Sequence, residues 1–290
     1  MLPKNYTSTD NKERVRKEDT GLIKKEFLKK KRKLKYLGMP SGEMRDILAW
    51  QNYINNSSAI EIDPEQRSEL VLSAIKNNLQ DKVKVLFGDV QQILIKGKDK
   101  FSNKLDFPYD IVFLDCFGTI LYKGLKRIKA ITSLFEKQKG HSFLFLLTFN
   151  LRERKFCKHS VLNVFDKIQK DLLGFYLHDD TVKSHMGSVI NWYKSKNTHE
   201  MYRQKLFVPY FIKTMAEDNG FTTHIYTPIF YLGFNNSPMI HFAFRLTPEI
   251  ESPTKAISEQ TIIDVINLKL KEASKQRVFL RREQAPSLNI

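Results

Sequence analysis

The stretch from Lys35 to Asp63 constrains the fold more than any other part of this 290-residue chain. It predicts a short apolar strand at 34–37, a glycine turn at 38–42, a helix at 43–54 and a second strand at 58–62. The helix is predicted from apolar residues at helical spacing, namely Met44, Ile47, Leu48 and Ile54. This order of elements is typical of the first unit of a parallel α/β sheet.

Strands and helices continue to alternate after Asp63. We expect strands at 82–87, 109–114 and 141–149, each preceded by a helix. The helix after Asp63-Pro64 is expected to bury a stripe formed by Val71, Leu72, Ile75 and Leu79. Two apolar strands at 221–231 and 239–246 flank a Gly-Asn turn and predict an antiparallel hairpin. The predicted fold class is therefore α/β, with a doubly wound and mostly parallel sheet.

Acidic side chains lie at or just past the carboxyl ends of three predicted parallel strands, at Glu61, Asp89 and Asp115. The carboxyl ends of parallel strands meet at one edge of a sheet, so we expect these acids to lie near the turn at Gly38. Backbone N–H groups of a glycine turn can approach a polar ligand, and an acid about 20 residues on can accept hydrogen bonds from a ribose diol. A plain turn, and an Asp89 that caps the next helix, are the alternative interpretations.

The net charge of +16 is the most unusual bulk property of the chain. Such a surplus attracts polyanions, of which nucleic acid is the commonest. Cations are concentrated near the N-terminus and in the later polar region, and the candidate phosphate contacts are Lys29, Lys30, Lys31, Arg32, Arg203 and Lys205. Two alternatives could explain the surplus without nucleic acid. A genome of low GC content favours lysine, and the N-terminal cations could lie on the solvated face of a helix that buries Leu22, Ile23 and Phe27.

Cysteine content and hydropathy indicate in which cellular compartment the protein is expected. The chain has only Cys116 and Cys157, which cannot form a disulfide framework. We find no apolar run of the roughly 18 residues that span a bilayer, and the N-terminus lacks the apolar segment of a signal peptide. We therefore expect a cytoplasmic protein without membrane contact.

In motif order, residues 33–246 resemble a class I S-adenosylmethionine-dependent methyltransferase, which implies a Rossmann-like fold. The resemblance consists of a glycine turn after strand one, an acid ending strand two, Gly88-Asp89 ending strand three, a polar tetrapeptide from Asp115 and a terminal hairpin. It implies S-adenosylmethionine as the cofactor and methyl transfer as the reaction, and the charge favours DNA or RNA as the acceptor.

The resemblance also assigns roles to single residues. The cofactor-binding residues that it implies are Gly38, Ser41, Gly42, Glu61, Ile62, Asp89, Val90 and Asp115. Glu61 would bind the ribose hydroxyls, Asp89 would face the adenine amine, and Asp115 would stand beside the transferring methyl group as the catalytic acceptor. Cys116 does not follow a proline, as the nucleophile of cytosine-C5 enzymes does, and is interpreted as a buried strand-end cysteine.

The predicted organisation has five parts. They are a basic N-terminal extension at 1–33, a Rossmann-like cofactor-binding core at 34–150, a helical insertion for substrate recognition at 151–220, the terminal β-hairpin at 221–248, and a C-terminal helix with a basic tail at 249–290. The insertion offers other candidate bases, namely His178, His185 and Tyr210. A protein partner or a second copy of the chain is left open, since no recognisable DNA-reading domain is present.

Two other functions compete with methyl transfer. The first is a nucleic-acid-binding protein on a methyltransferase-like scaffold without catalysis, either alone or as a subunit of a larger complex. The second is a metal-dependent hydrolase that uses His178-Asp179-Asp180 and His185. Their spacing matches no metal motif, and Cys157 and His159 lack a second Cys/His pair, so no metal site is predicted.

Overall fold

The computed structural model describes residues 10–27, 32–116, 118, 125–150, 208–209, 211–233 and 237–249. The helices are α1 (Asp10–Phe27), α2 (Arg45–Trp50), α3 (Pro64–Lys76), α4 (Val90–Lys96) and α5 (Leu125–Lys137). The strands are β1 (Leu34–Gly38), β2 (Ile54–Glu61), β3 (Val83–Phe87), β4 (Ile111–Cys116), β5 (Phe143–Asn150), β6 (Phe221–Ile225), β7 (Ile229–Leu232) and β8 (Pro238–Pro248).

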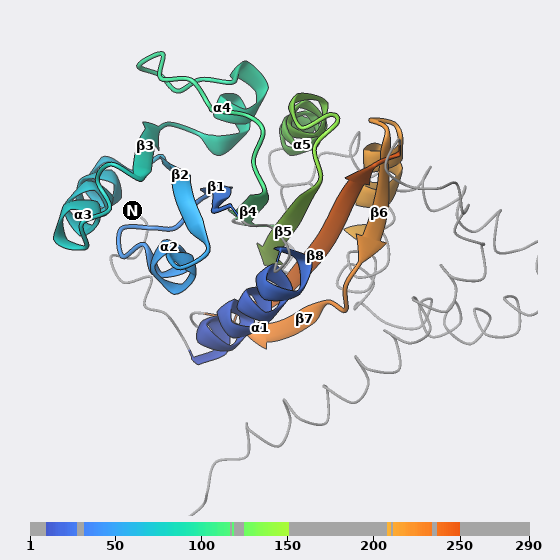
Figure 1. Ribbon diagram of the computed structural model, residues 1–290, viewed down its shortest axis with the longest axis horizontal. Helices are drawn as coiled ribbons and strands as arrows, with labels where there is room; N and C mark the ends of the chain where they lie inside the picture. Colours follow the sequence, from blue (N-terminus) through green and yellow to red (C-terminus); the bar gives the residue numbers. More distant parts are fainter. Residues whose placement is uncertain are drawn as a thin grey trace, which may run out of the picture.

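These strands form one mixed sheet in the order β3-β2-β1-β4-β5-β8-β6, with β7 also paired to β8 (Figure 1). The five strands from β3 to β5 are parallel, and β8 runs antiparallel to β5. The predicted Rossmann-like fold class with a terminal antiparallel pair is therefore confirmed. Since β2 and β4 lie on opposite sides of β1, the strand order reverses there, and ligands of such sheets bind outside this switch point.

The edge of the terminal hairpin is an interrupted strand. β6 pairs with residues 244–248 of β8, and β7 pairs with residues 238–241 on the same side. Between them the Tyr226 N–H still donates to the Ala243 carbonyl. The single strand predicted at 221–231 is broken at 226–228, where Pro228 has no N–H to give to the ladder.

Helices cover both faces of the sheet. The helices α1, α2 and α3 pack on one face, while α4, α5 and the helical residues 211–217 pack on the other. The central strands β4 and β5 are nearly continuous apolar runs because both of their faces are buried. Among the described residues, no helix is long and apolar enough to cross a membrane.

Two predicted helices differ from the structure. The helix after the glycine turn ends at Trp50, and Ile54 opens β2, where it pairs with Leu34 of β1. Ile54 is buried as predicted, but it lies in a strand because parallel pairing with β1 overrides the helical spacing.

The buried stripe predicted for α3 was also wrong, apart from Leu79. The helix buries Leu70 and Ala74, whereas Val71, Leu72 and Ile75 are 38%, 65% and 55% exposed. These side chains are exposed because α3 lies at the end of the sheet, beside the edge strand β3. Only a narrow stripe of the helix therefore packs on strands.

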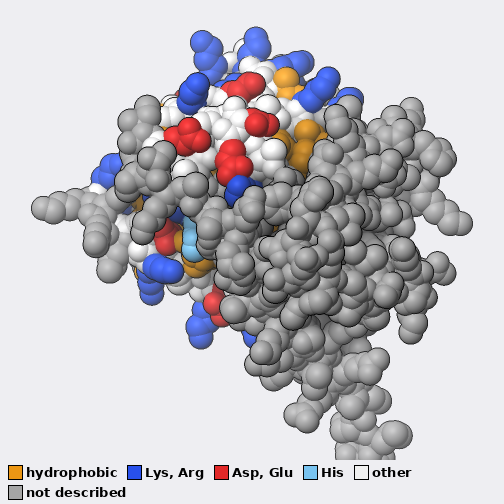
Figure 2. All heavy atoms as spheres, turned by 90° about the vertical axis from the view of Figure 1, so that its right-hand side faces the viewer, with side chains coloured by type: hydrophobic (Ala, Val, Ile, Leu, Met, Phe, Trp, Pro, Cys, Tyr) orange, Lys and Arg blue, Asp and Glu red, His pale blue; other side chains and the backbone are white. Residues whose placement is uncertain are grey.

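The charge of the described surface is mixed. Figure 2 shows Asp and Glu side chains gathered among Lys and Arg side chains on the part of this side that is coloured. Most of the +16 net charge comes from residues outside the described ranges. A nucleic-acid contact on the described part therefore has to be argued from particular residues, not from the overall charge.

Candidate functional site

The structure places the polar strand ends at one edge of the sheet. Gly38 at the end of β1 pairs with Ala59 of β2 and with Phe113 of β4. Glu61 and Asp115 each lie two residues beyond these partners, on opposite sides of β1. The next strand joins the same edge, because the Gly88 N–H donates to the Glu61 carbonyl at 3.0 Å.

Glu61 is held by the backbone that follows it. Its Oε1 accepts hydrogen bonds from the N–H groups of Ile62 (2.7 Å) and Asp63 (2.9 Å). Its Oε2 takes no hydrogen bond from the described residues. Burial raises the pKa of Glu61, and the two N–H donors oppose this shift. Beside it, the Ile62 side chain is 52% exposed, so an acid and an apolar surface adjoin at the end of β2.

Asp89 takes the capping role that the sequence allowed as an alternative. Its Oδ1 accepts from the N–H of Gln91 at 2.8 Å and the N–H of Gln92 at 3.4 Å, and so begins α4. Gly88 before it has φ of 146°, which favours glycine at this turn. Val90 is the first residue of α4 and packs against the core.

Both glycines of the predicted ligand turn permit close packing of side chains. A Cβ on Gly38 would lie 2.0 Å from the Tyr36 hydroxyl, and one on Gly42 would lie 2.6 Å from a Glu69 oxygen. The Gly42 N–H also donates to Gln66 Oε1 at 3.3 Å. Within this turn, Ser41 has φ of 58°, a left-handed conformation that is strained for a residue with a Cβ.

Tyr36 is fully buried beneath this turn. Its hydroxyl has no hydrogen-bond partner among the described residues. Burial raises the pKa of Tyr36 well above its ordinary value, and the nearby Asp46 carboxylate raises it further. A buried donor without a partner is rare, so this hydroxyl is a candidate contact for a ligand or a water molecule.

Asp115 is the penultimate residue of β4 and forms an ion pair with α1. Its Oδ2 lies 3.0 Å from the Lys12 ammonium, and the two side chains are 27% and 21% exposed. Across the sheet, Asp115 is in register with Thr148 of β5, and Thr148 is in register with His241 of β8. Side chains in register on neighbouring strands share a face, so a row of three polar residues lies under α1.

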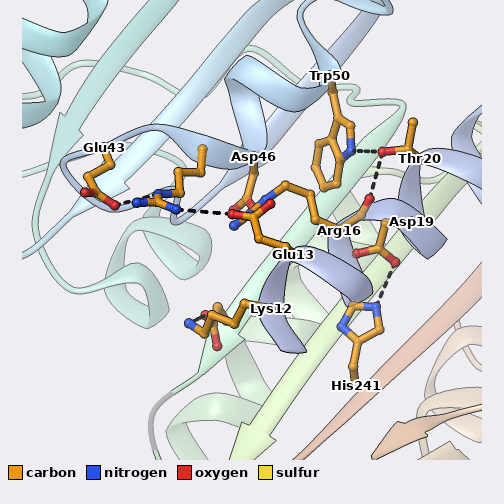
Figure 3. A network of polar contacts seen from close by, with 11 residues as sticks. Lys12, Glu13, Arg16, Asp19, Thr20, Glu43, Asp46, Trp50 and His241 are labelled. Atoms are coloured by element: carbon orange, nitrogen blue, oxygen red, sulfur yellow. Dashed lines mark hydrogen bonds and ion pairs between the residues drawn. The ribbon is translucent and has the colours of Figure 1, made fainter. Parts of the chain in front are cut away.

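This polar row continues into a hydrogen-bonded chain. Thr148 Oγ1 and His241 Nδ1 are 2.8 Å apart. His241 Nε2 lies 2.9 Å from Asp19 Oδ1 of α1, a contact that Figure 3 shows. At the other end of this chain, the buried Tyr231 side chain of β7 lies near Thr148. All four side chains are buried, so the chain is shielded from water.

A second set of contacts joins α1 to α2. Arg16 Nε donates to Asp46 Oδ1 at 2.7 Å, and the Trp50 indole N–H donates to Thr20 Oγ1 at 3.0 Å (Figure 3). Burial raises the pKa of Asp46, and the Arg16 charge only partly offsets this shift. Helix α1 thus closes the site on one side with residues of its inner face.

The sequence did not predict these roles for α1. Its buried residues Val15, Asp19, Ile23 and Phe27 recur every four residues, so a carboxylate lies within an otherwise apolar stripe. An acid on the buried face of an amphipathic helix needs a buried partner, and this was the signal that could have identified Asp19. The helix predicted from Leu22, Ile23 and Phe27 was too short to include it.

Arg32 lies away from this site. It forms two hydrogen bonds with the buried Asp110, at 2.8 and 2.7 Å, before the first residues of β1 and β4. This is the amino-terminal edge of the sheet, opposite to the acids. The other predicted phosphate contacts, namely Lys29, Lys30, Lys31, Arg203 and Lys205, lie outside the described residues.

The remaining chemical candidates are limited. Cys116 is buried, and burial raises the pKa of its thiol, which disfavours a nucleophilic thiolate. No group of three or more metal-ligating side chains occurs within the described part of the chain. The insertion candidates His178, Asp179, Asp180, His185 and Tyr210, and also Cys157 and His159, fall outside it.

No family model and no curated protein sequence matches this chain. Solved structures of similar fold include a proposed RNA methyltransferase from Pyrococcus horikoshii, with 12% identity over 86% of this chain and 91% of its own and a TM-score of 0.47. An O-methyltransferase of tomaymycin synthesis from Streptomyces achromogenes, in complex with S-adenosylmethionine, has 11% identity over 84% and 83%, with a TM-score of 0.45. An O-methyltransferase from Bacillus cereus, in complex with S-adenosylhomocysteine, has 10% identity over 84% of each chain, with a TM-score of 0.46.

Proposed function

We propose that this chain is an S-adenosylmethionine-dependent methyltransferase that acts on nucleic acid. The observation that carries the proposal is the position of Glu61 and Asp115 on either side of β1 at the switch point. One acid next to an exposed apolar side chain suits a nucleoside, and a second acid on the other side of β1 suits a cationic centre.

The residues at this edge fit such a cofactor. The Oε2 of Glu61 takes no hydrogen bond from the described residues, so it can accept hydrogen bonds from ribose hydroxyls. Ile62 offers apolar surface to an adenine ring. The unpartnered Tyr36 hydroxyl below Gly38 is a polar contact for the amino-acid part. Ser41, Gly42, Asp89 and Val90 complete the predicted set.

The protein contributes mostly position and electrostatics. When bound, the cofactor supplies an electrophilic methyl group on a sulfonium, which makes a covalent enzyme intermediate unnecessary. Asp115 places a carboxylate where it can attract a positive charge or hold a proton that leaves the acceptor. Lys12 on α1 balances that carboxylate, and the buried row behind it keeps water away.

The proposal is tested by calorimetric titration with S-adenosylmethionine. We expect binding to the wild type and a loss of about 10- to 100-fold in Glu61→Ala, because hydrogen bonds to a charged group contribute about 1.5–3 kcal/mol. Glu65→Ala is the matched control, since Glu65 is an exposed acid in the first turn of α3. No heat signal for the wild type, or equal affinity of Glu61→Ala, would contradict cofactor binding at this edge.

The acceptor is tested separately with cofactor carrying a labelled methyl group. Single- and double-stranded DNA and RNA are incubated with the wild type and with Asp115→Asn. We expect label in nucleic acid for the wild type and a large loss for the variant. Label in added protein or small molecules, and none in nucleic acid, would refute nucleic acid as the acceptor without contradicting the proposed cofactor site.

A specific observation favours the alternative of nucleic-acid binding without catalysis. Tyr36 covers Gly38, and the Gly42 N–H is already bonded to Gln66, so the turn meets protein groups where a cofactor would approach. This alternative requires salt-dependent nucleic-acid binding with no affinity for S-adenosylmethionine. The calorimetric titration therefore decides between the two functions.

A further inference from the structure

Two phenylalanine rings and two cations gather at the end of β3. The rings of Phe87 and Phe101 are stacked, with centroids 5.9 Å apart and planes 19° from parallel. The Lys100 ammonium lies 3.7 Å from the Phe87 centroid and 5.1 Å from that of Phe101. The Arg67 guanidinium of α3 lies 5.2 and 5.5 Å from the same centroids. We call these four residues the Phe101 platform.

The loop that carries Phe101 is fixed by one buried carboxylate. Asp99 Oδ1 accepts from the N–H groups of Phe101 (2.8 Å) and Asn103 (2.9 Å). Its Oδ2 accepts from Asn103 Nδ2 (3.0 Å) and from the N–H of Phe87 (3.2 Å). Burial alone would raise the pKa of Asp99, but these donors lower it overall, so the loop is tied to β3 by an ionised group.

This fixed loop leaves Phe101 57% exposed. Exposure of one aromatic ring is common, but here the exposed ring stacks on Phe87 next to two cations, which gives a preformed surface for a planar ligand. Arg67 supports this interpretation, since its buried Nε has no hydrogen-bond partner among the described residues. The ring pair and its cations are thus already in place before any partner binds.

The chain segment that carries Phe101 is rich in lysine. Exposed lysines occur at four of the nine positions from 96 to 104, namely Lys96, Lys98, Lys100 and Lys104. The one acid among these nine positions, Asp99, is buried and occupied by the loop. Aromatic faces next to several cations are the combination that binds single-stranded nucleic acid, by base stacking and by phosphate contacts.

The platform adjoins the candidate site. Lys100 N–H donates to the carbonyl of Phe87, the last residue of β3, and Gly88-Asp89 follows directly. A strand of nucleic acid that stacks on Phe101 would therefore pass the edge where Glu61 and Asp89 lie. A base that is paired in a duplex has its faces covered by its neighbours, so stacking on Phe101 requires an unpaired base.

From this geometry we propose that the Phe101 platform binds single-stranded nucleic acid, with one unpaired base on Phe101 and adjacent phosphates on Arg67 and Lys100. This inference rests on the proposed function for the identity of the substrate, and it names the surface and the strandedness. Stacking of one base on an aromatic side chain contributes about 1–3 kcal/mol, which corresponds to roughly 5- to 150-fold in affinity.

The test measures binding of fluorescent 12-nucleotide RNA and DNA, single-stranded and as duplexes, by anisotropy at low and moderate salt. We expect Phe101→Leu to weaken single-strand binding about 10-fold and Phe101→Trp to retain it. Leu72→Ala is the matched control, because Leu72 is 65% exposed on α3 and lies outside the platform. Lys100→Gln should lower the affinity and reduce its salt dependence.

Several outcomes would overturn the platform. The first is that the wild type binds no single-stranded nucleic acid, and the second is that Phe101→Leu binds it with the same affinity as the wild type. The third is that Phe101→Leu weakens duplex binding as much as it weakens single-strand binding. Preference for an acidic peptide over both nucleic acids would also refute it. Calorimetry with S-adenosylmethionine on the same variants separates the two proposals, because Phe101→Leu is expected to keep wild-type cofactor affinity. If neither the wild type nor any variant binds S-adenosylmethionine, the proposed function is refuted, whereas single-strand binding by the Phe101 platform is not.

Discussion

The ion pair between Lys12 and Asp115 predicts a competition with the cofactor. The ammonium of Lys12 lies 3.0 Å from Asp115 Oδ2, the carboxylate that we propose to stand beside the sulfonium. Under the proposed function, S-adenosylmethionine would also bring positive charge to this edge. Lys12 and the cofactor therefore present like charges to one acid, and replacement of Lys12 by Met should tighten cofactor binding.

The size of the effect follows from the geometry. Two unit charges 3.0 Å apart attract by roughly 5 kcal/mol at an effective dielectric constant of about 20. Desolvation and ordering of the lysine offset most of this, and exposed pairs contribute about 0–1 kcal/mol. Since the two side chains are only 21% and 27% exposed, we take the upper value of about 1 kcal/mol, or about 5-fold in Kd.

The assay is calorimetric titration of Lys12→Met with S-adenosylmethionine and S-adenosylhomocysteine. Tightening should be about 5-fold for S-adenosylmethionine and smaller for S-adenosylhomocysteine, whose sulfur is neutral. Lys17→Met is the matched control, because Lys17 is an exposed lysine one turn further along α1. Unchanged or weaker binding of S-adenosylmethionine by Lys12→Met would refute the competition and make the pair a structural contact only.

Three further predictions concern residues around the site. First, cofactor affinity should be full above the pKa of Glu61, which burial raises, and should fall as the pH is lowered through it; titrations across the acidic range should show a flatter profile for Glu61→Gln. Second, Gly38→Ala should lower the free energy of unfolding by about 3 kcal/mol, because its Cβ would lie 2.0 Å from the buried Tyr36 hydroxyl. Denaturant unfolding checks this, and Tyr36→Phe should leave stability unchanged or raised, since the hydroxyl has no partner among the described residues. Third, Asp19→Ala should destabilise the fold by about 3 kcal/mol in the same assay, because it leaves the buried His241 without this partner, whereas the exposed neighbour Glu18→Ala should have little effect.

The sheet was predictable because the local sequence of its central strands indicates how they are buried. Residues of β4 and β5 are apolar almost without interruption, which requires burial on both faces and hence a parallel sheet with helices on each side. The strand-end rule then placed Glu61 and Asp115 at one edge without any knowledge of contacts. What this rule could not supply was the partner of each acid.

The contacts of α1 could not be predicted because they join distant parts of the chain. The apolar stripe around Asp19 could have indicated that this acid is buried, but nothing in the sequence indicates that its partner is His241, 222 residues away. The error in α3 has a related cause. Val71, Leu72 and Ile75 have helical apolar spacing, but their burial depends on how much of the sheet lies beneath the helix, and α3 lies at the edge beside β3.

These observations change the interpretation of the N-terminal segment. The predicted phosphate contacts Lys29, Lys30 and Lys31 lie outside the described residues, and the preceding helix α1 directs Lys12, Arg16 and Asp19 inward to Asp115, Asp46 and His241. Each of these contacts joins α1 to a different element, namely β4, α2 and β8, so α1 fixes all three around the carboxyl edge of the sheet. A polar helix can be held in this way because every buried charge on it meets a partner, and a buried charge without one would not be tolerated. These pairs add to the apolar contacts of Val15, Ile23 and Phe27, and Lys12–Asp115 is the one that a cationic ligand at Asp115 would disturb first.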